Sequence, residues 1–321
     1  ADVDSKPRSV PGDQPGIPNN KGFDAFFGYL NQRKAHNYYP EQLWHNRERV
    51  HYPQHKGHDH KKPNDYDAHG RIIVNGIRDQ NSARYSFDEY TAASLDFVRA
   101  NAGRPFFLYL PYTPPHGALE VPELGEYTNC DWPYVEQKIW AAMITRMDRA
   151  IGDLLDLLDE LGIADNTLVF FTSDNGYSAK GYAPDECLPR LFHNSGPWKG
   201  QKGNLHQGAV RVPTVARWPA RITPGTNSSH VWAFWDFLPT AADAAGVTPP
   251  PDTDGISILP TLLGDPDRQR QHAYLYWEHQ NEQAIRLEEW YIYRQSPGKP
   301  IQVTHADDDQ DDEDGLDDRA S

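Results

Sequence analysis

The sequence TLVFFTSDNG at residues 167–176 combines an apolar strand with the polar cluster that ends it. Its first six residues are mostly β-branched or aromatic, which predicts a buried parallel strand. An open α/β sheet binds its ligands just beyond the carboxyl ends of its strands. Asp174 and Asn175 would therefore present a carboxylate and an amide oxygen there, the hard donors that Ca²⁺ or Mg²⁺ selects. The alternative is an Asx-turn that only ends the strand.

A second apolar strand is predicted over residues 105–110, PFFLYL, and it leads into a proline-rich segment that holds His116. A long helix from about Trp132 to Leu161 separates the two strands, because apolar residues recur there at every fourth position. Strand, helix and strand make a βαβ unit whose strands lie parallel. His116 and Asp174 are thus expected at the same edge of one sheet, although a histidine in a proline-rich loop also has a purely structural explanation.

A glycine-rich stretch at residues 196–213 is the third candidate segment. Glycines that recur every few residues let the backbone bend closely around a ligand. Lys199 and Lys202 lie inside the stretch and would bring positive charge to an anion. A glycine-rich turn with two solvated lysines explains the same pattern, so both interpretations stay open.

The predicted fold class is α/β, with a mostly parallel central sheet flanked by helices and a small C-terminal antiparallel β subdomain. Residues 1–265 form the main domain in this prediction. Residues 272–305 carry short apolar stretches that predict antiparallel strands. Residues 306–321 are mostly acidic, so they repel one another and are expected to be disordered.

A polar stretch at residues 36–70 is rich in histidine, and a His-rich insertion is placed at about 45–70. Such tracts can bind transition metals. The spacings fit no standard ligand pattern, so an exposed insertion loop that shapes substrate access is the favoured interpretation. The histidines are His36, His45, His51, His55, His58, His60 and His69.

Composition argues against several classes of function. The formal charge of −15 speaks against nucleic-acid binding, which requires a basic face. No run of about 18 apolar residues is present, so no membrane-spanning helix is expected. The first residues lack the apolar core of a signal peptide, and Cys130 and Cys187 are too few for a disulfide framework. A soluble protein is expected, with its compartment and oligomeric state left open.

Several motifs occur in a specific order along the chain. They are Lys21 to Gly28, Pro111 to His116, Thr172 to Gly176, Gly200 to Gly203 with Gly208 to Pro213, and Asp236 to Thr240 followed by Asp254-Gly255. In this order and separation they resemble the sulfatase family, in particular its arylsulfatase A-like members, within the alkaline-phosphatase-like superfamily. The resemblance extends to about residue 295.

The resemblance implies a sulfuric ester hydrolase that acts on a small-molecule or glycan sulfate ester. Asp174 and Asn175 match two ligands of the active-site calcium, and Ca²⁺ is favoured over Mg²⁺. His116 matches the histidine that hydrogen-bonds the ester near its leaving oxygen, and Lys202 matches the lysine that neutralises the sulfate. The alternatives are a phosphoesterase of the same superfamily and a non-catalytic pseudoenzyme that binds calcium or a sulfated glycan.

The chain departs from the family pattern at the nucleophile. Sulfatases carry an early Asp-Asp pair for calcium and a Cys- or Ser-x-Pro-x-Arg motif whose first residue matures to formylglycine. Neither is found in the chain, because Ser5-Lys6-Pro7-Arg8 and Cys187-Leu188-Pro189-Arg190 hold the arginine one position too early. Gln207-Gly208-Ala209 also stands where the family has Glu-Gly-Gly. We therefore expect a sulfatase that lacks its N-terminal portion and is inactive alone.

Overall fold

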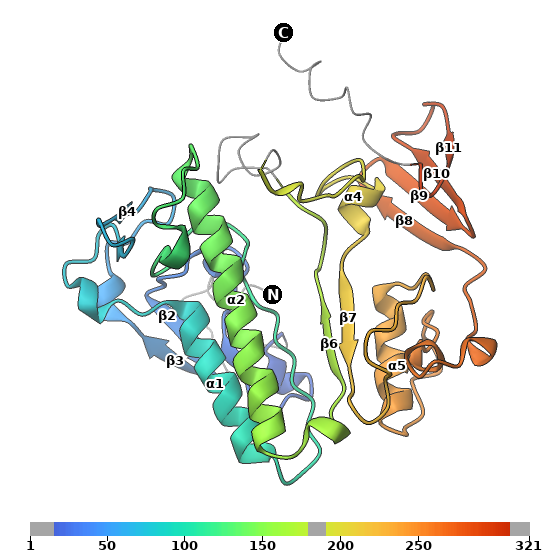
Figure 1. The fold of residues 1–321 in the computed structure, drawn as a ribbon, viewed down its shortest axis with the longest axis horizontal. Helices are drawn as coiled ribbons and strands as arrows, with labels where there is room; N and C mark the ends of the chain where they lie inside the picture. Colours follow the sequence, from blue (N-terminus) through green and yellow to red (C-terminus); the bar gives the residue numbers. More distant parts are fainter. Residues whose placement is uncertain (1–15, 179–190, 309–321) are drawn as a thin grey trace. The chain divides into compact units, whose positions relative to one another are not determined.

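The computed structural model describes residues 16–178 and 191–308. Within these ranges the chain forms two compact units, the first comprising residues 16–161 and the second comprising residues 162–178 and 191–308 (Figure 1). No helix in the described ranges has the length and apolar character needed to cross a membrane. Three stretches discussed above lie outside the described residues, namely 5–8, 187–190 and the acidic tail from 309 onward.

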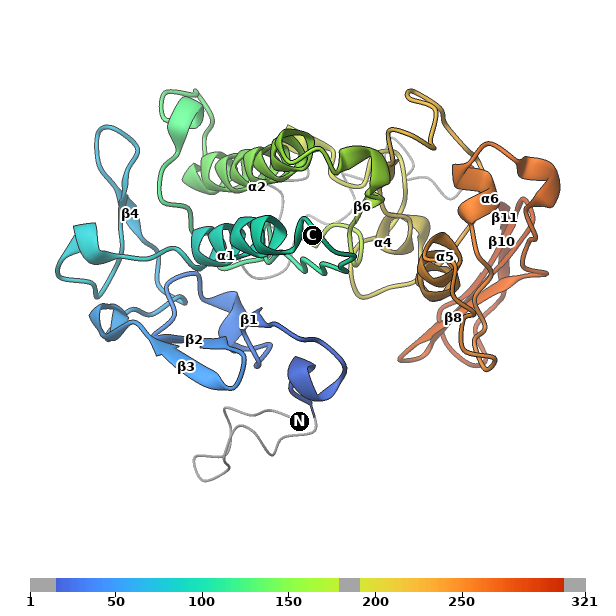
Figure 2. The same ribbon diagram turned by 90° about the horizontal axis from the view of Figure 1, so that it is seen from below.

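Two helices dominate the first unit, α1 (Ser86–Asn101) and α2 (Val135–Glu160), and they lie side by side in both views (Figures 1 and 2). The long helix predicted from apolar periodicity is therefore confirmed. Gly162 follows its end with a left-handed φ of 67°, a conformation that glycine adopts without strain. The two helices contribute to one apolar core, which includes Tyr38, Tyr39, Val74, Tyr85, Phe87, Val121, Ile139, Ala142 and Met143.

Short strands complete the first unit. An antiparallel sheet has the order β1-β2-β3, formed by Phe27–Gly28, Gln42–His45 and Glu48–His51. A second antiparallel pair consists of β4 (Asp65–Tyr66) and β5 (Ile72–Ile73). The prediction of an exposed His-rich loop is wrong for His55, which is only 1% exposed. Both of its ring nitrogens have backbone partners, Pro40 and Arg84, so its burial leaves no polar atom unsatisfied.

The predicted strand before Asp174 is observed as β6 (Val169–Thr172) in the second unit. It pairs with β7 (Thr214–Arg217) in antiparallel register, with Phe170 opposite Ala216. All strand pairs among the described residues are antiparallel. Residues 105–110 run without a strand assignment there, with Phe107 58% and Tyr109 64% exposed. The predicted parallel pair is thus not found in this part of the chain.

A four-stranded antiparallel sheet with the order β11-β10-β9-β8 lies near the C-terminal end of the second unit (Figure 2). It confirms the predicted antiparallel subdomain and adds a strand that was not predicted, β11. In the described part of the second unit, the sheet is preceded by the short helices α4 (Gln207–Val210), α5 (Phe237–Ala244) and α6 (Leu259–Leu262). The strands are β8 (Leu275–His279), β9 (Glu282–Leu287), β10 (Trp290–Arg294) and β11 (Gln302–His305).

Candidate functional site

The loop after β6 carries the predicted calcium ligands. Asp174 is exposed and Asn175 is half-buried just beyond the carboxyl end of the strand. An Asx-turn at Asp174 would need the N–H of Gly176, but that N–H donates to the carbonyl oxygen of Ala209 at 2.8 Å. Asn175 donates its side-chain N–H to the Gly176 carbonyl at 2.9 Å, so its amide oxygen remains the atom suited to a cation. The Asx-turn interpretation therefore fails at Asp174.

The glycine-rich segment at residues 198–211 crosses this loop at close range. Besides the Gly176–Ala209 bond, the N–H of Lys202 donates to the Tyr177 carbonyl at 2.7 Å. Glycine is required at the crossing, because a Cβ on Gly176 would lie 2.8 Å from the carbonyl carbon of Gly208. A Cβ on Gly208 would in turn lie 2.7 Å from the Trp198 carbonyl oxygen. The glycines thus serve the close approach of two backbones.

The charged side chains of the two loops are available to bind a ligand. Within the described residues, the carboxylate of Asp174 and the ammonium of Lys202 have no ion-pair or hydrogen-bond partner. Lys202 is half-buried, whereas Lys199 in the same segment is exposed. Lys202 is also the lysine whose backbone N–H is bonded to the loop after β6, so it is the stronger of the two candidates for binding an anion beside Asp174.

The C-terminal sheet supports the segment that carries Lys202. The N–H of Leu205 donates to a carboxylate oxygen of Glu282 at 2.7 Å, and the hydroxyl of Tyr291 donates to the Leu205 carbonyl. The ring of His206 lies on that of Tyr293, with centroids 4.1 Å apart. Sequence reasoning missed these supporting residues because they lie far along the chain and carry no motif of their own.

His116 lies in the proline-rich loop of the first unit and is half-buried. Its N–H donates to the Thr113 carbonyl at 2.9 Å, and its own carbonyl accepts the hydroxyl of Tyr38 at 2.8 Å. Its Nδ1 lies 2.7 Å from the Gly117 carbonyl. A carbonyl only accepts, so Nδ1 carries the hydrogen of the neutral ring. The ring of His36 stacks on it at 4.5 Å.

A buried polar network lies behind this loop and was also not foreseen. Glu120, which is 1% exposed, accepts the Tyr38 N–H at 3.1 Å and the side-chain amide of Asn64 at 2.8 Å. His58 forms an ion pair with it at 3.0 Å. Burial lowers the pKa of His58, but the hydrogen bond and charge of Glu120 outweigh burial and raise that pKa overall. Its other nitrogen faces the Asn75 carbonyl, so both ring nitrogens meet acceptors.

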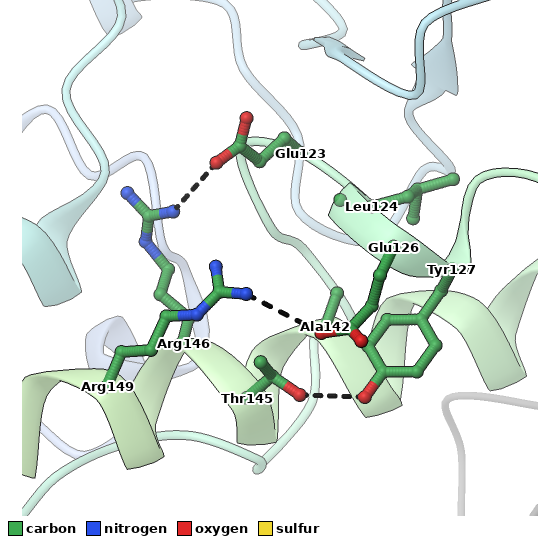
Figure 3. A pocket seen from close by; sticks show the side chains of 9 residues that line it. Glu123, Leu124, Glu126, Tyr127, Ala142, Thr145, Arg146 and Arg149 are labelled. Carbon is green, nitrogen blue, oxygen red and sulfur yellow. Dashed lines mark hydrogen bonds and ion pairs between the residues drawn. The ribbon is translucent and has the colours of Figure 1, made fainter. Parts of the chain in front are cut away.

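A small pocket in the first unit lies between α2 and the 3₁₀ helix η7 (Gly125–Tyr127), and its charges are already paired (Figure 3). Arg146 makes two bonds of 2.7 Å to Asp88 and lies 3.7 Å from Glu123. Arg149 pairs with Glu126 at 3.5 Å. Each guanidinium in the pocket therefore has a carboxylate partner. None of the predicted site residues lines it.

The structure thus brings three of the four predicted residues onto neighbouring loops of one unit. Asp174, Asn175 and Lys202 belong to the second unit and His116 to the first, so their predicted meeting at one sheet edge stays a prediction. Asp174 and Asn175 fit a calcium ion as two of the roughly six to eight oxygen ligands that it takes. Residues 16–178 and 191–308 hold no group of three or more His, Cys, Asp or Glu side chains arranged for a metal.

Comparisons with known proteins identify the family. The family model described as Sulfatase matches residues 6–247, and that described as N-sulphoglucosamine sulphohydrolase, C-terminal, matches residues 200–305. The steryl-sulfatase of Mus musculus is 35% identical over 182 residues, which cover 56% of this chain and 28% of that protein. The N-acetylgalactosamine-6-sulfatase of Homo sapiens is 35% identical over 179 residues, which cover 54% and 32%. The match therefore spans only about a third of these relatives' length.

A solved structure gives the same answer for the fold. The structure of Ps i-CgsB in complex with k-i-k-neocarrahexaose is similar with a TM-score of 0.69 at 25% sequence identity, and covers 92% of this chain and 63% of that chain. The predicted alkaline-phosphatase-like α/β fold class is confirmed by this similarity. Because the family model matches most of the sequence, from residue 6 to residue 247, the chain belongs to the sulfatase family.

Proposed function

We propose that the full-length protein hydrolyses an organic or glycan sulfate ester with the help of a bound calcium ion. One observation carries the proposal. A carboxylate, an amide oxygen and an ammonium, from Asp174, Asn175 and Lys202, lie on two loops joined by backbone hydrogen bonds, and the two charged groups lack partners in the described residues. Such a set suits an anionic ester beside a divalent cation. The family assignment supports the sulfate ester as that anion.

Asp174 and Asn175 would hold the calcium ion through their side-chain oxygens. These two donors satisfy only part of its shell of about six to eight oxygens. Other ligands would come from water, the substrate or residues beyond those described. When bound, the calcium would supply positive charge next to the sulfate oxygens.

Lys202 and His116 would act on the ester itself. A sulfate ester is an anion, and negative charge grows on its bridging oxygen as the S–O bond breaks. The ammonium of Lys202 would stabilise that charge, and its backbone is fixed before the reaction by the bond to the Tyr177 carbonyl. His116 would donate from Nε2 to the leaving oxygen, because its Nδ1 is engaged with the Gly117 carbonyl.

We also propose that residues 1–321 alone bind the anion without turning it over. The residues with assigned roles hold a cation, an anion or a proton, and none of them is a nucleophile. This is the non-catalytic alternative as it applies to the chain by itself. A phosphoesterase remains the alternative for the full-length protein, and a paired assay separates the two.

The test measures hydrolysis of an aryl sulfate and of the matching aryl phosphate by the full-length protein, with and without calcium. We expect the sulfate to be the better substrate and Lys202→Ala to lower kcat/KM by about 100-fold or more. Lys199→Ala is the matched control, since its exposed side chain belongs to the same segment, and it should retain activity within about 2-fold. Preference for the phosphate, or equal activity of both lysine variants, would refute the proposal.

A further inference from the structure

One histidine of the His-rich tract lies against a predicted site residue. His36, the last residue of the 3₁₀ helix η4 (Lys34–His36), stacks on His116 with ring centroids 4.5 Å apart and ring planes 22° apart. Both side chains are half-buried. The two residues are far apart in the sequence, so the stack is a tertiary contact that the fold must hold in place.

The backbones of the two histidines are joined on either side of the stack. The carbonyl of His36 accepts the N–H of Ala118 at 3.1 Å. In the other direction, the carbonyl of His116 accepts the hydroxyl of Tyr38 at 2.8 Å. Because each histidine is bonded to the segment that follows the other, the distance between their rings is fixed by the backbone as well as by the stack.

A buried carboxylate anchors this arrangement to the core. Glu120 accepts the N–H of Tyr38, and it is itself held by Asn64 and His58. Tyr38 is fully buried and stacks on Tyr85 at 5.2 Å. The segment that carries His36 is therefore tied to the interior, and its ring presents a rigid face to His116.

The stack affects the orientation of the His116 ring and therefore which ring nitrogen carries the hydrogen. Its Nδ1–H reaches the Gly117 carbonyl only in one orientation of the ring. An aromatic ring that lies flat against the imidazole restricts rotation out of that orientation. The bond at Nδ1 in turn sets the tautomer of the neutral ring.

We propose that His36 is a positioning residue of the sulfatase site, which holds the His116 imidazole in the orientation and tautomer that its catalytic role requires. This inference rests on the proposed function, in which His116 donates to the leaving oxygen. The role needs a flat ring of similar size and needs no charge. Phenylalanine at position 36 should therefore preserve the orientation of His116, whereas alanine should not.

The first test uses the chain itself and no substrate. Two-dimensional ¹H–¹⁵N spectra of the histidine rings at about pH 9, where histidine is neutral, report which nitrogen bears the hydrogen. We expect His116 to carry it on Nδ1 in the wild type and in His36→Phe, and to shift toward the Nε2–H form in His36→Ala. His69→Ala, a change at an exposed histidine of the same tract, should leave the His116 signals unchanged.

The second test measures aryl sulfate turnover by the full-length protein. His36→Ala should lower kcat by about 10- to 100-fold with KM changed by less than about 3-fold, because misplacing a proton donor affects the chemical step. His36→Phe should restore most of kcat, and His69→Ala should match the wild type.

The two tests distinguish failure of the positioning role from failure of the proposed function. An unchanged His116 tautomer in His36→Ala overturns the positioning role, as does an unchanged kcat in an active enzyme. A loss of activity that phenylalanine does not restore also overturns it. If the wild-type enzyme cleaves no sulfate ester, the proposed function fails, and the ring spectra still decide whether His36 orients His116.

Discussion

Replacing Gly176 by alanine tests how the two loops of the second unit are held together. The backbone of Gly176 is not in the left-handed region, so alanine meets no conformational penalty there. Its added Cβ would overlap the carbonyl oxygen of Gly208, and it would also lie 2.8 Å from the carbon of that carbonyl and 3.0 Å from the Cα of Ala209. Ordinary contact begins at 3.4 Å, so the loops must separate by more than about 1 Å.

That separation stretches the bonds that join the loops. The Gly176–Ala209 bond of 2.8 Å and the Lys202–Tyr177 bond of 2.7 Å would approach or pass the limit of about 3.2 Å for a good N–H···O bond. Losing two such bonds costs about 1–3 kcal/mol. The smaller entropy of the unfolded alanine chain returns about 0.4–1 kcal/mol. We expect a net loss of about 1 kcal/mol, or about 0.5 M in the urea midpoint for a slope near 2 kcal/mol/M.

Tryptophan fluorescence suits this measurement, because Trp198, Trp218, Trp232, Trp235, Trp277 and Trp290 lie in the second unit. Gly152→Ala is the matched control. Its Cβ would meet nothing within 4 Å in the middle of α2, so the same change should stabilise the first unit by about 0.5–1 kcal/mol. A Gly176→Ala protein that unfolds at the wild-type urea concentration would refute the account of the loop crossing.

Two further predictions concern charge. Asp174→Ala in the full-length protein should weaken calcium binding by at least about 10-fold in calorimetric titration, since a carboxylate ligand is lost. The control Asp153→Ala, at an exposed site on α2, should bind calcium as the wild type does. If Asp174→Ala also bound calcium with the wild-type affinity, Asp174 would not be a calcium ligand. The pKa of His58 is raised above 6.5 by Glu120, so this pair stabilises the fold fully below pH 6.5 and its contribution is lost as pH rises through the folded pKa. Thermal unfolding should therefore show a midpoint that falls as the pH rises above 6.5 in the wild type and stays flat in Glu120→Gln; parallel profiles would contradict this.

The pH window is chosen so that a second buried histidine does not interfere. Burial lowers the pKa of His55 below 6.5, with the carbonyl of Pro40 opposing that shift. Its unfolded form therefore takes up a proton that the folded form resists, and stability drops below pH 6.5. His55 therefore lowers stability below pH 6.5, whereas the contribution of His58 is lost above pH 6.5. Of these two histidines, only His58 can cause a fall in stability above pH 6.5.

Much of the second unit could be predicted from local pattern. The apolar run before Asp174, the glycine-rich segment and three of the C-terminal strands each leave a periodic or compositional signal. Strand β11 (Gln302–His305) left little signal, because it is short, Val303 is its only apolar residue, and it pairs at the edge of the sheet with β10 alone. The direction of the partner of β6 was also predicted wrongly within the described residues, because a continuous apolar run is typical of parallel strands whereas β6 pairs with β7 in antiparallel register.

Residues 254–258 include the apolar alternation Ile256-Ser257-Ile258, which is typical of a strand, yet they form none in the structure. Side chains from α5 and the residue before it take the backbone donors that a sheet would have used. The buried carboxylate of Asp236 accepts the N–H of Ile256 at 2.7 Å, and the hydroxyl of Thr240 accepts the N–H of Ile258 at 2.9 Å. Asp236 also binds His272 at 2.7 Å. The alternation of apolar residues could not reveal that side chains already accept hydrogen bonds from these backbone N–H groups.

The same tertiary logic governs the candidate site. A lysine stabilises developing charge best when its position is fixed before the reaction, yet its side chain is long and flexible. The fold compensates at the backbone: Lys202 is bonded to the loop of Asp174, and the residues that follow it are held by Glu282, Tyr291 and Tyr293 of the C-terminal sheet. The sheet therefore supports the segment that carries Lys202, the lysine that we propose binds the anion. A substitution that loosens this sheet should therefore displace Lys202 more than it displaces Asp174 and Asn175 on the loop after β6.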